Sequence, residues 1–463
     1  MKVFKVLHKL EKPKITRFQQ YLNSPYFNRR KDVILLLEAW LGGNRKRQRP
    51  EAYWSAIYDL ETFEKSKWHL LTSRLFKLLE SFLITEELQE HPATRQFYLV
   101  KAYRKLQEEQ LFEKAVADTG KALEKQAFRN MNYWQYQHNL SYEKYDYIIS
   151  ANRKVKSNLQ EVTEYFDTYF LSTKLRQACY ALSRSIIKQE SYNIRLVDEA
   201  IEEVERNFTH LKVPAIAVYY YCYKAISTEE NEPYFKQLRE AMEKYQQFFP
   251  PSEMRDIYTV AINYSIRKLN TGNPIFIKEA FELYQLSLAQ GYLFEDGIML
   301  ESTYVNIVML ASKLKKYDWA VSFITDQQSH LKEAVRDSLY RFSLGKIYYE
   351  KGLLEKSLKE LVLVDTKASF IFLGARVLQL KIYYELDEID PLESLLESLR
   401  VYLQRSKDLA YRKAHYSNIL SFTKRLLQLP AMSKKEKLAF QEQVEETVVL
   451  GEKEWFLRQI GGK

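Results

Sequence analysis

The fifteen residues Leu344–Leu358, with the sequence LGKIYYEKGLLEKSL, decide the fold class of this chain. Gly352 turns the chain within this stretch, and apolar residues continue at helical spacing on both sides of it. In the second half, the small residue Ser357 has apolar residues three positions before it, at Leu354, and one and four positions after it, at Leu358 and Leu361. These positions share one helical face, so a neighbouring helix can approach closely at the serine while the larger side chains interlock around it.

The same arrangement recurs along the chain, with an apolar residue three before, one after and four after each small residue. The small residues are Ala200, Ala241, Ala280, Ala320 and Ser357, with a degraded copy at Ser394 and an early copy at Ala115. From Ala200 onward they step by 41, 39, 40, 37 and 37 residues. A period near this length fits two helices of about 15 residues each with short loops. The segment 130–189 lacks the column, and we expect two long helices there.

The composition favours the same fold. Only 12 Gly and 11 Pro are present in 463 residues, too few for the many tight turns of a strand-rich protein. The 35 Tyr and 25 Phe supply large side chains that fill the space between layers of helices. The sequence therefore predicts an all-α protein, a superhelical stack of antiparallel helix pairs preceded by a helical N-terminal module.

The quoted stretch also resembles a tetratricopeptide (TPR) repeat. The family's Leu-Gly-x-x-Tyr, turn and small-residue positions correspond to Leu344, Gly345, Tyr348, Gly352 and Ser357, although Arg341 stands where the family has Trp. The segment 316–321 resembles the start of a TPR second helix. The period exceeds the family's repeat of about 34 residues. The resemblance, over roughly residues 95–400, implies a TPR-like α-solenoid.

Three segments follow from these patterns: a basic helical module at 1–92, TPR-like repeats at 93–430 and a C-terminal capping helix at 431–463. The run Tyr21–Asn28, with Arg17 and Phe18 before it, is similar to the opening of uncharacterised helical-repeat proteins of Bacteroidetes. That resemblance implies no activity.

Charge is concentrated at one end. Residues 1–50 contain thirteen Lys and Arg and three acidic residues. The remaining 413 residues contain 57 Lys and Arg and 57 Asp and Glu, so their charges cancel. This asymmetry suggests an anionic partner, with nucleic acid as the alternative to a protein partner. A basic cap that only keeps the end of the stack soluble remains an open interpretation. The candidate anion-binding patch consists of Arg29, Arg30, Lys31, Arg45, Lys46, Arg47 and Arg49.

A curved stack of helix pairs presents a concave surface formed by the first helix of each pair, and such surfaces hold peptides or protein segments. We therefore expect a non-catalytic binding scaffold with a protein or peptide partner. Candidate groove aromatics, each of which could instead be a core residue, are Tyr219, Tyr220, Tyr223, Tyr340, Tyr348 and Tyr349.

Motifs for chemistry are not found in the sequence. The seven His residues are scattered, and Thr119-Gly120-Lys121 falls within an expected helix rather than a phosphate-binding loop. We expect no catalytic site, cofactor or metal. The two cysteines, Cys179 and Cys222, cannot form a disulfide framework, and no apolar stretch is long enough to span a bilayer. A cytoplasmic protein is the simplest expectation.

Overall fold

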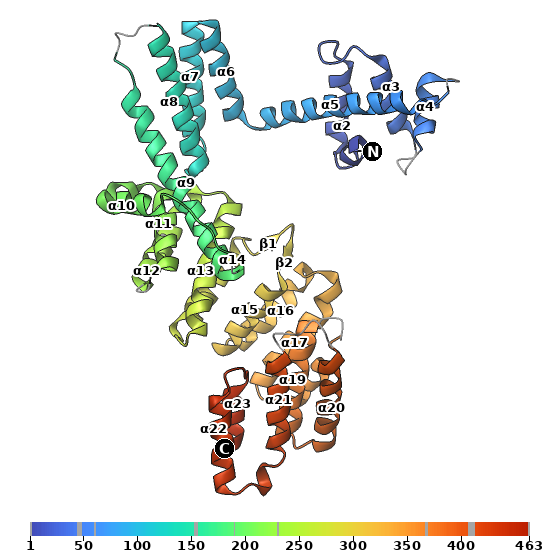
Figure 1. Cartoon of the computed structure of the whole chain (residues 1–463), viewed down its shortest axis with the longest axis vertical. Helices are drawn as coiled ribbons and strands as arrows, with labels where there is room; N and C mark the ends of the chain where they lie inside the picture. The colour runs from blue at the N-terminus through green and yellow to red at the C-terminus, as the bar shows by residue number, and fades with distance from the viewer. Residues whose placement is uncertain are drawn as a thin grey trace. The chain divides into compact units, whose positions relative to one another are not determined.

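A computed structural model describes residues 2–43, 49–59, 62–151, 156–188, 190–228, 231–365, 369–405 and 413–461. Within these ranges the chain forms 23 α-helices and four short 3₁₀ helices (Figure 1). Two short strands, β1 (Phe294–Glu295) and β2 (Ile298–Met299), pair antiparallel. The predicted all-α class is confirmed. No helix of the described part is long and apolar enough to cross a membrane.

The N-terminal helices enclose a core of their own. They are α1 (Lys2–Leu7), α2 (Lys12–Asn23), α3 (Lys31–Gly42), α4 (Pro50–Tyr58) and α5 (Lys65–Glu90). Pro13 lies in the first turn of α2, and α3 ends at Gly42. Trp40, Trp54 and Trp68 are fully buried between these helices.

The turn between α2 and α3 is held by Asn28, whose side chain is buried. Its Nδ2 donates to the carbonyl oxygens of Leu22, at 3.1 Å, and Arg30, at 3.0 Å. Its Oδ1 accepts from the backbone N–H of Arg30 at 3.1 Å. One side chain thus satisfies three backbone groups that the turn leaves without helical partners.

The chain as a whole forms two compact units, and α1–α5 belong to the first of them. Residues 1–178 and 194–219 form the N-terminal unit, and residues 179–193 and 220–463 form the C-terminal unit. The helices before the boundary region are α6 (Pro92–Leu106), α7 (Glu109–Glu124), α8 (Met131–Ala151), α9 (Leu159–Lys188), α10 (Val197–Arg206) and α11 (Pro214–Ser227). The long α8 and α9 are the two helices expected at 130–189.

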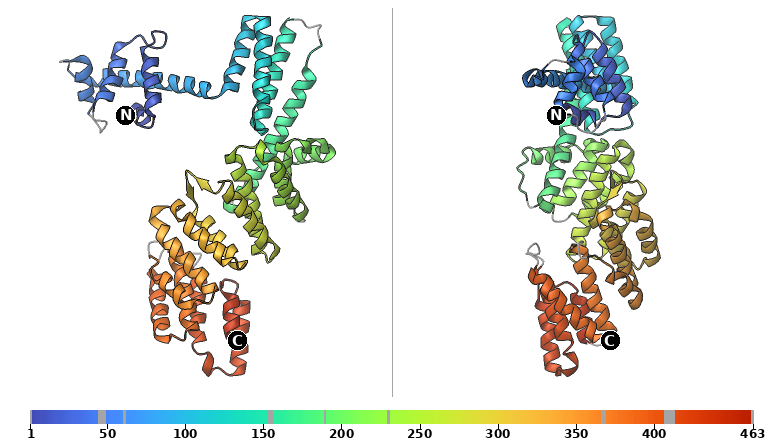
Figure 2. Two further views of the ribbon diagram at one scale, coloured as in Figure 1. Left: turned by 180° about the vertical axis from the view of Figure 1, so that it is seen from behind. Right: turned by 90° about the vertical axis from the view of Figure 1, so that its right-hand side faces the viewer.

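The C-terminal unit is itself a series of helices, coloured from yellow-green to red in Figure 2. They are α12 (Glu232–Tyr245), α13 (Pro251–Asn270), α14 (Ile275–Ala289), α15 (Glu301–Lys313), α16 (Tyr317–Gln327), α17 (Glu333–Glu350), α18 (Leu354–Val362), α19 (Ser369–Glu385), α20 (Ile389–Arg405), α21 (Lys413–Leu426), α22 (Lys434–Glu446) and α23 (Lys453–Gly461). Consecutive helices pack in pairs, α13 with α14, α15 with α16, α17 with α18 and α19 with α20. The first helices also touch one another, since α17 contacts both α15 and α19.

The small residues of the repeating column are buried, as predicted, on α7, α10, α12, α14, α16 and α18. They are Ala115, Ala200, Ala241, Ala280, Ala320 and Ser357. The degraded sixth copy was wrong, because Ser394 is exposed on α20. That helix instead buries a leucine stripe through Leu392, Leu399 and Leu403, which turns Ser394 toward solvent.

The pair α17–α18 shows why the column needs small residues. Ser357 Oγ donates to the carbonyl oxygen of Gly345 at 2.6 Å, so the two backbones lie close together. A Cβ atom at Gly345 would lie 2.7 Å from Cγ and Cδ2 of Leu361. Glycine is therefore required here by the approach of α18 rather than by a turn.

The two cysteines, 43 residues apart in sequence, meet inside the C-terminal unit. Cys179 and Cys222 are buried free thiols that share a hydrogen bond. Burial first, and then the neighbouring sulfur, raise the pKa of the Cys179 thiol well above its ordinary value. Both groups act as small apolar side chains in the packing.

Replacing Gly345 by Ala should destabilise the C-terminal unit by about 1–2 kcal/mol, because overpacking against Leu361 exceeds the gain in helix propensity. Gly120, in α7, provides the matched control, since nothing lies within 4 Å of a Cβ placed there. Gly120→Ala should stabilise the protein by roughly 0.5–1 kcal/mol. Urea unfolding of both variants distinguishes these outcomes, and equal effects would refute the close approach.

Asn28→Ala should lower the stability of the N-terminal helices by about 1–3 kcal/mol, because it leaves buried backbone groups without partners. Asn23→Ala removes one exposed hydrogen bond, to the Gln19 carbonyl, and should change stability by no more than about 0.5 kcal/mol. Thermal unfolding measures both. A loss at Asn28 no larger than that at Asn23 would show that the turn does not depend on this side chain.

Candidate binding cavity

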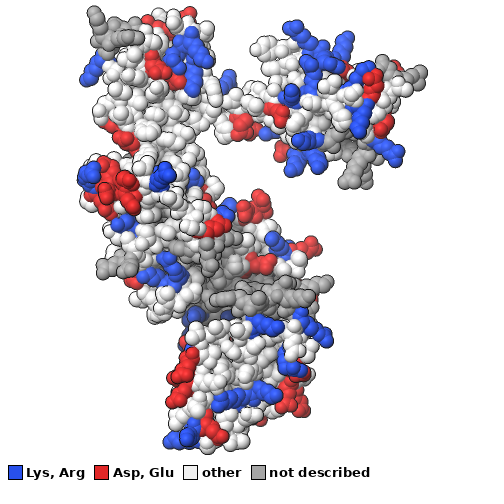
Figure 3. Space-filling view, in the orientation of Figure 1, with Lys and Arg blue, Asp and Glu red and all other residues white. Residues whose placement is uncertain are grey.

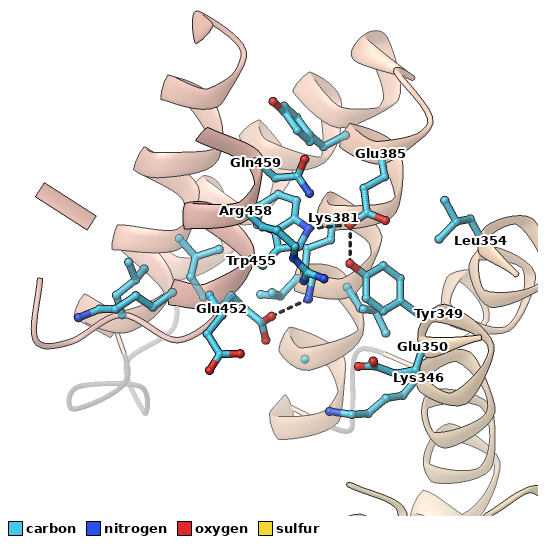
Figure 4. A pocket seen from close by; sticks show the side chains of 18 of the residues that line it. Lys346, Tyr349, Glu350, Leu354, Lys381, Glu385, Glu452, Trp455, Arg458 and Gln459 are labelled. Atoms are coloured by element: carbon cyan, nitrogen blue, oxygen red, sulfur yellow. Dashed lines mark hydrogen bonds and ion pairs between the residues drawn. The ribbon is translucent and has the colours of Figure 1, made fainter. Parts of the chain in front are cut away.

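A cavity of about 1480 Å³ opens within the C-terminal unit between α17, α19, α21 and the C-terminal segment that includes α23 (Figure 4). On α17, Phe342, Lys346 and Tyr349 follow one another at helical spacing. On α19 the corresponding face runs from Gly374 through Lys381 to Glu385. The lining therefore comes from aligned faces of the first helices of successive pairs, with the C-terminal segment as a further wall.

Glu385 joins three elements of this site. Tyr349 Oη, on α17, donates to Glu385 Oε1 at 2.5 Å, and Trp455 Nε1, on α23, donates to the same oxygen at 2.6 Å (Figure 4). Burial, and then the hydrogen bond to Glu385, raise the pKa of the Tyr349 phenol. Tyr349 thus stays protonated and remains a donor to this carboxylate at neutral pH.

Lys381 lies one helical turn before Glu385 and forms the second contact with the C-terminal segment. Its Nζ donates to Glu452 Oε2 at 2.6 Å. The ammonium also lies 4.7 Å from the ring centre of Tyr349 and 5.7 Å from that of Trp455. With only 8% of its surface exposed, Lys381 is compensated on both sides, by a carboxylate and by aromatic faces.

The pKa of the Glu452 carboxyl group depends on two opposing effects, its burial and the positive charges beside it. Its burial opposes ionisation, but the charge of Lys381 and the hydrogen bond from it, together with Lys346, hold the pKa of Glu452 below its ordinary value. The ion pair is therefore intact at neutral pH.

Three cations of the lining make no hydrogen bond or ion pair with a described residue: Lys313, Lys346 and Arg458. Lys313 and Arg458 are exposed, whereas Lys346 is half-buried on α17. Burial lowers the pKa of Lys346, against the opposing effect of Glu452 and Glu350. Lys346 is thus a half-buried cation that Glu452 and Glu350 attract without a direct hydrogen bond or ion pair.

Two carboxylates of the lining, Glu350 and Glu454, also make no ion pair within the described ranges, so the cavity is of mixed charge. Both are exposed and retain their water. A charge in a poorly hydrated position gains more from a counter-ion than an exposed one does. Among the lining cations that make no ion pair, Lys346 is therefore the one that would gain most from a neighbouring anion.

The six candidate groove aromatics occupy different environments. Tyr219 and Tyr220 are buried core residues of α11. Tyr223, Tyr340 and Tyr348 are half-buried and are not among the residues that line the cavity. Tyr349 lines it directly.

The candidate anion-binding patch lies on the N-terminal helices, where Lys and Arg side chains cover much of the face visible in Figure 3. Arg29, Lys31 and Arg49 are exposed. Arg30 Nε donates to Asp32 at 3.0 Å, and this pair is completed by the Tyr58 hydroxyl, 2.8 Å from Asp32. The remaining members, Arg45, Lys46 and Arg47, lie outside the described residues.

Among the described residues, no group of three or more His, Cys, Asp or Glu side chains is arranged to hold a metal ion. Comparison of the chain with protein-family models, with curated proteins and with solved structures gave no match.

Sequence reasoning missed most of the residues that define the cavity, namely Lys346, Lys381, Glu385, Glu452, Trp455 and Arg458. Lys346 could have been predicted from the sequence, because it lies four residues after Phe342 and three before Tyr349 on one helical face. Trp455 was not, because 70 residues separate it from Glu385. Its only signal was a tryptophan in a short C-terminal helix, whose indole N–H needs a partner once the ring is buried.

A double-mutant cycle with Lys381→Met and Glu452→Gln should give a coupling free energy of about 1 kcal/mol at neutral pH, since the pair is partly exposed. The folded-state pKa of Glu452 lies below the ordinary 4.5, so its contribution is present above that pH and is lost as the pH falls through the lowered value. Urea unfolding at decreasing pH measures the coupling. A coupling near zero at pH 7 would contradict the ion pair.

Proposed function

We propose that this chain is a non-catalytic binding scaffold and that its C-terminal cavity holds a segment of a partner protein that bears acidic side chains. The observation behind the proposal is the unpaired Lys346 in a cavity lined by aligned first helices. Stacked helix pairs of this kind bind extended segments along such surfaces. The close contact of Gly345 with Leu361 and Ser357 supports the TPR-like description of the repeat.

The shape and composition of the cavity suit a peptide. The volume exceeds that of an ordinary small-molecule pocket, which spans roughly 300–1,000 Å³. The half-buried Tyr349 and Tyr384 offer aromatic surface for apolar side chains, and Lys313, Lys346 and Arg458 offer charge for carboxylates. An anionic group beside Lys346 would replace the water that this ammonium has lost.

A cytoplasmic location is part of this proposal. It is supported by the low cysteine content: Cys179 and Cys222 are the two cysteines among 463 residues, too few for the disulfide framework that is typical of oxidising compartments.

A photo-crosslinking amino acid at Gln459, which lines the cavity, should form an adduct with a partner protein in the native host. The same amino acid at Leu286, an exposed position of α14, serves as the control. Mass spectrometry of the adduct identifies the attached segment, which should contain Asp or Glu. Adducts no more abundant than at Leu286, or adducts only with nucleic acid, would contradict the proposal.

The crosslinked segment, made as a synthetic peptide, should bind about tenfold more weakly to Lys346→Met than to the unchanged protein, because a charge-assisted contact is lost. Lys359 of α18 is exposed and outside the cavity lining, so Lys359→Met should leave the affinity unchanged. Isothermal titration calorimetry measures both. If the two variants behave alike, Lys346 does not contact the peptide.

A further inference from the structure

The turn between α2 and α3 exposes an aromatic side chain that the fold does not need. Tyr26 is 87% exposed, among the highest values for a large apolar side chain in the described ranges, and the adjacent Phe27 is 43% exposed. Water contact with an aromatic face is unfavourable, so a ring held outward in this way offers surface to a partner.

The exposed ring is supported rather than loose. Tyr26 meets Phe27 edge to face with ring centres 4.9 Å apart, and Phe27 stacks on Tyr21 at 4.0 Å. Tyr21 in turn packs against Phe82 of α5, at 5.6 Å. Asn28 fixes the backbone of the same turn through its three hydrogen bonds. Tyr26 is thus a preorganised platform, which lowers the entropic cost of binding.

Positive charge flanks the platform. Arg29 and Lys31 are exposed and make no hydrogen bond or ion pair with a described residue, whereas Arg30 between them is paired with Asp32. The N-terminal module, residues 1–92, contains 17 Lys and Arg against 11 Asp and Glu, so its net charge is positive.

We propose that this turn binds single-stranded nucleic acid, with Tyr26 stacking on a base and Arg29 and Lys31 contacting phosphates. A supported aromatic face beside unpaired cations is the arrangement that such strands require, because bases that are not in a duplex expose their faces. A duplex hides those faces. The proposal concerns a surface separate from the C-terminal cavity and does not depend on it.

The test uses the full-length chain and fluorescein-labelled single strands of DNA and of RNA, each about 15 nucleotides long, titrated at several salt concentrations. Tyr26→Ala should weaken binding by roughly 5- to 100-fold through loss of one stacked base. The double variant Arg29→Gln, Lys31→Gln should reduce the slope of log K against log salt by about 1.4, since two phosphate contacts are lost.

Matched controls separate these effects from general changes of surface and charge. Tyr98→Ala removes another exposed tyrosine, on α6, and Lys434→Gln with Lys435→Gln removes two exposed charges from α22. Both controls should bind like the unchanged protein. Comparison of the DNA and RNA strands tells which nucleic acid is preferred, and either preference supports the proposal.

Three outcomes would overturn the proposal. They are no binding of either strand at about 50 mM salt, equal binding of a duplex of the same sequence with no effect of Tyr26→Ala, and binding to phosphatidylserine vesicles but not to single strands. Circular dichroism of Tyr26→Ala verifies that the exposed substitution leaves the helices intact.

Discussion

The close approach of α17 and α18 at Gly345 is the constraint on which the C-terminal architecture depends. The Ser357 hydroxyl reaches the Gly345 carbonyl, and Leu361 occupies the space that a side chain at Gly345 would need. Because α17 also contacts α15, α16 and α19, its position fixes the line of first helices that form the cavity wall. A small residue of the same column is also buried on α7, α10, α12, α14 and α16, whereas α8 and α9 lack it.

The C-terminal segment completes the cavity through polar contacts that complement its apolar packing. Lys381 and Glu385 lie one turn apart on α19, and their partners Glu452 and Trp455 are three residues apart. Phe456 and Ile460 of α23 pack with Phe422 of α21 and other apolar side chains. The segment 450–461 therefore packs against α21 and also supplies a wall of the site. The same residues that hold it, Lys381 and Glu385, leave Lys346 as the half-buried cation without a partner.

How much of this could be read from the sequence depends on the range of the interaction. The helix pairs and their small residues were predictable, because helical periodicity is local and the column at Ala241, Ala280 and Ala320 repeats it. Periodicity also gave one wrong prediction, a buried small residue at Ser394. The buried face of α20 is formed by leucines instead, and Ser394 lies on the opposite, exposed face. Periodicity could not tell which face of α11 points inward, so Tyr219 and Tyr220 remained candidates for the groove although a core position was the favoured interpretation. Contacts between residues far apart in the sequence, such as Trp455 with Glu385 and Cys179 with Cys222, could not be predicted, because no local sequence pattern indicates them.

The account of the cavity rests on the electrostatic state of Lys346, which can be measured directly. Reductive ¹³C-methylation of the lysines, with the Lys346 signal assigned from Lys346→Arg, allows its titration to be followed by NMR in the full-length protein. The account predicts that Lys346 titrates below the ordinary pKa of 10.5 in the free protein and that an acidic segment bound in the cavity moves the titration upward. Titration at or above 10.5 in the free protein would show an ammonium that is already hydrated or paired, and would contradict the account.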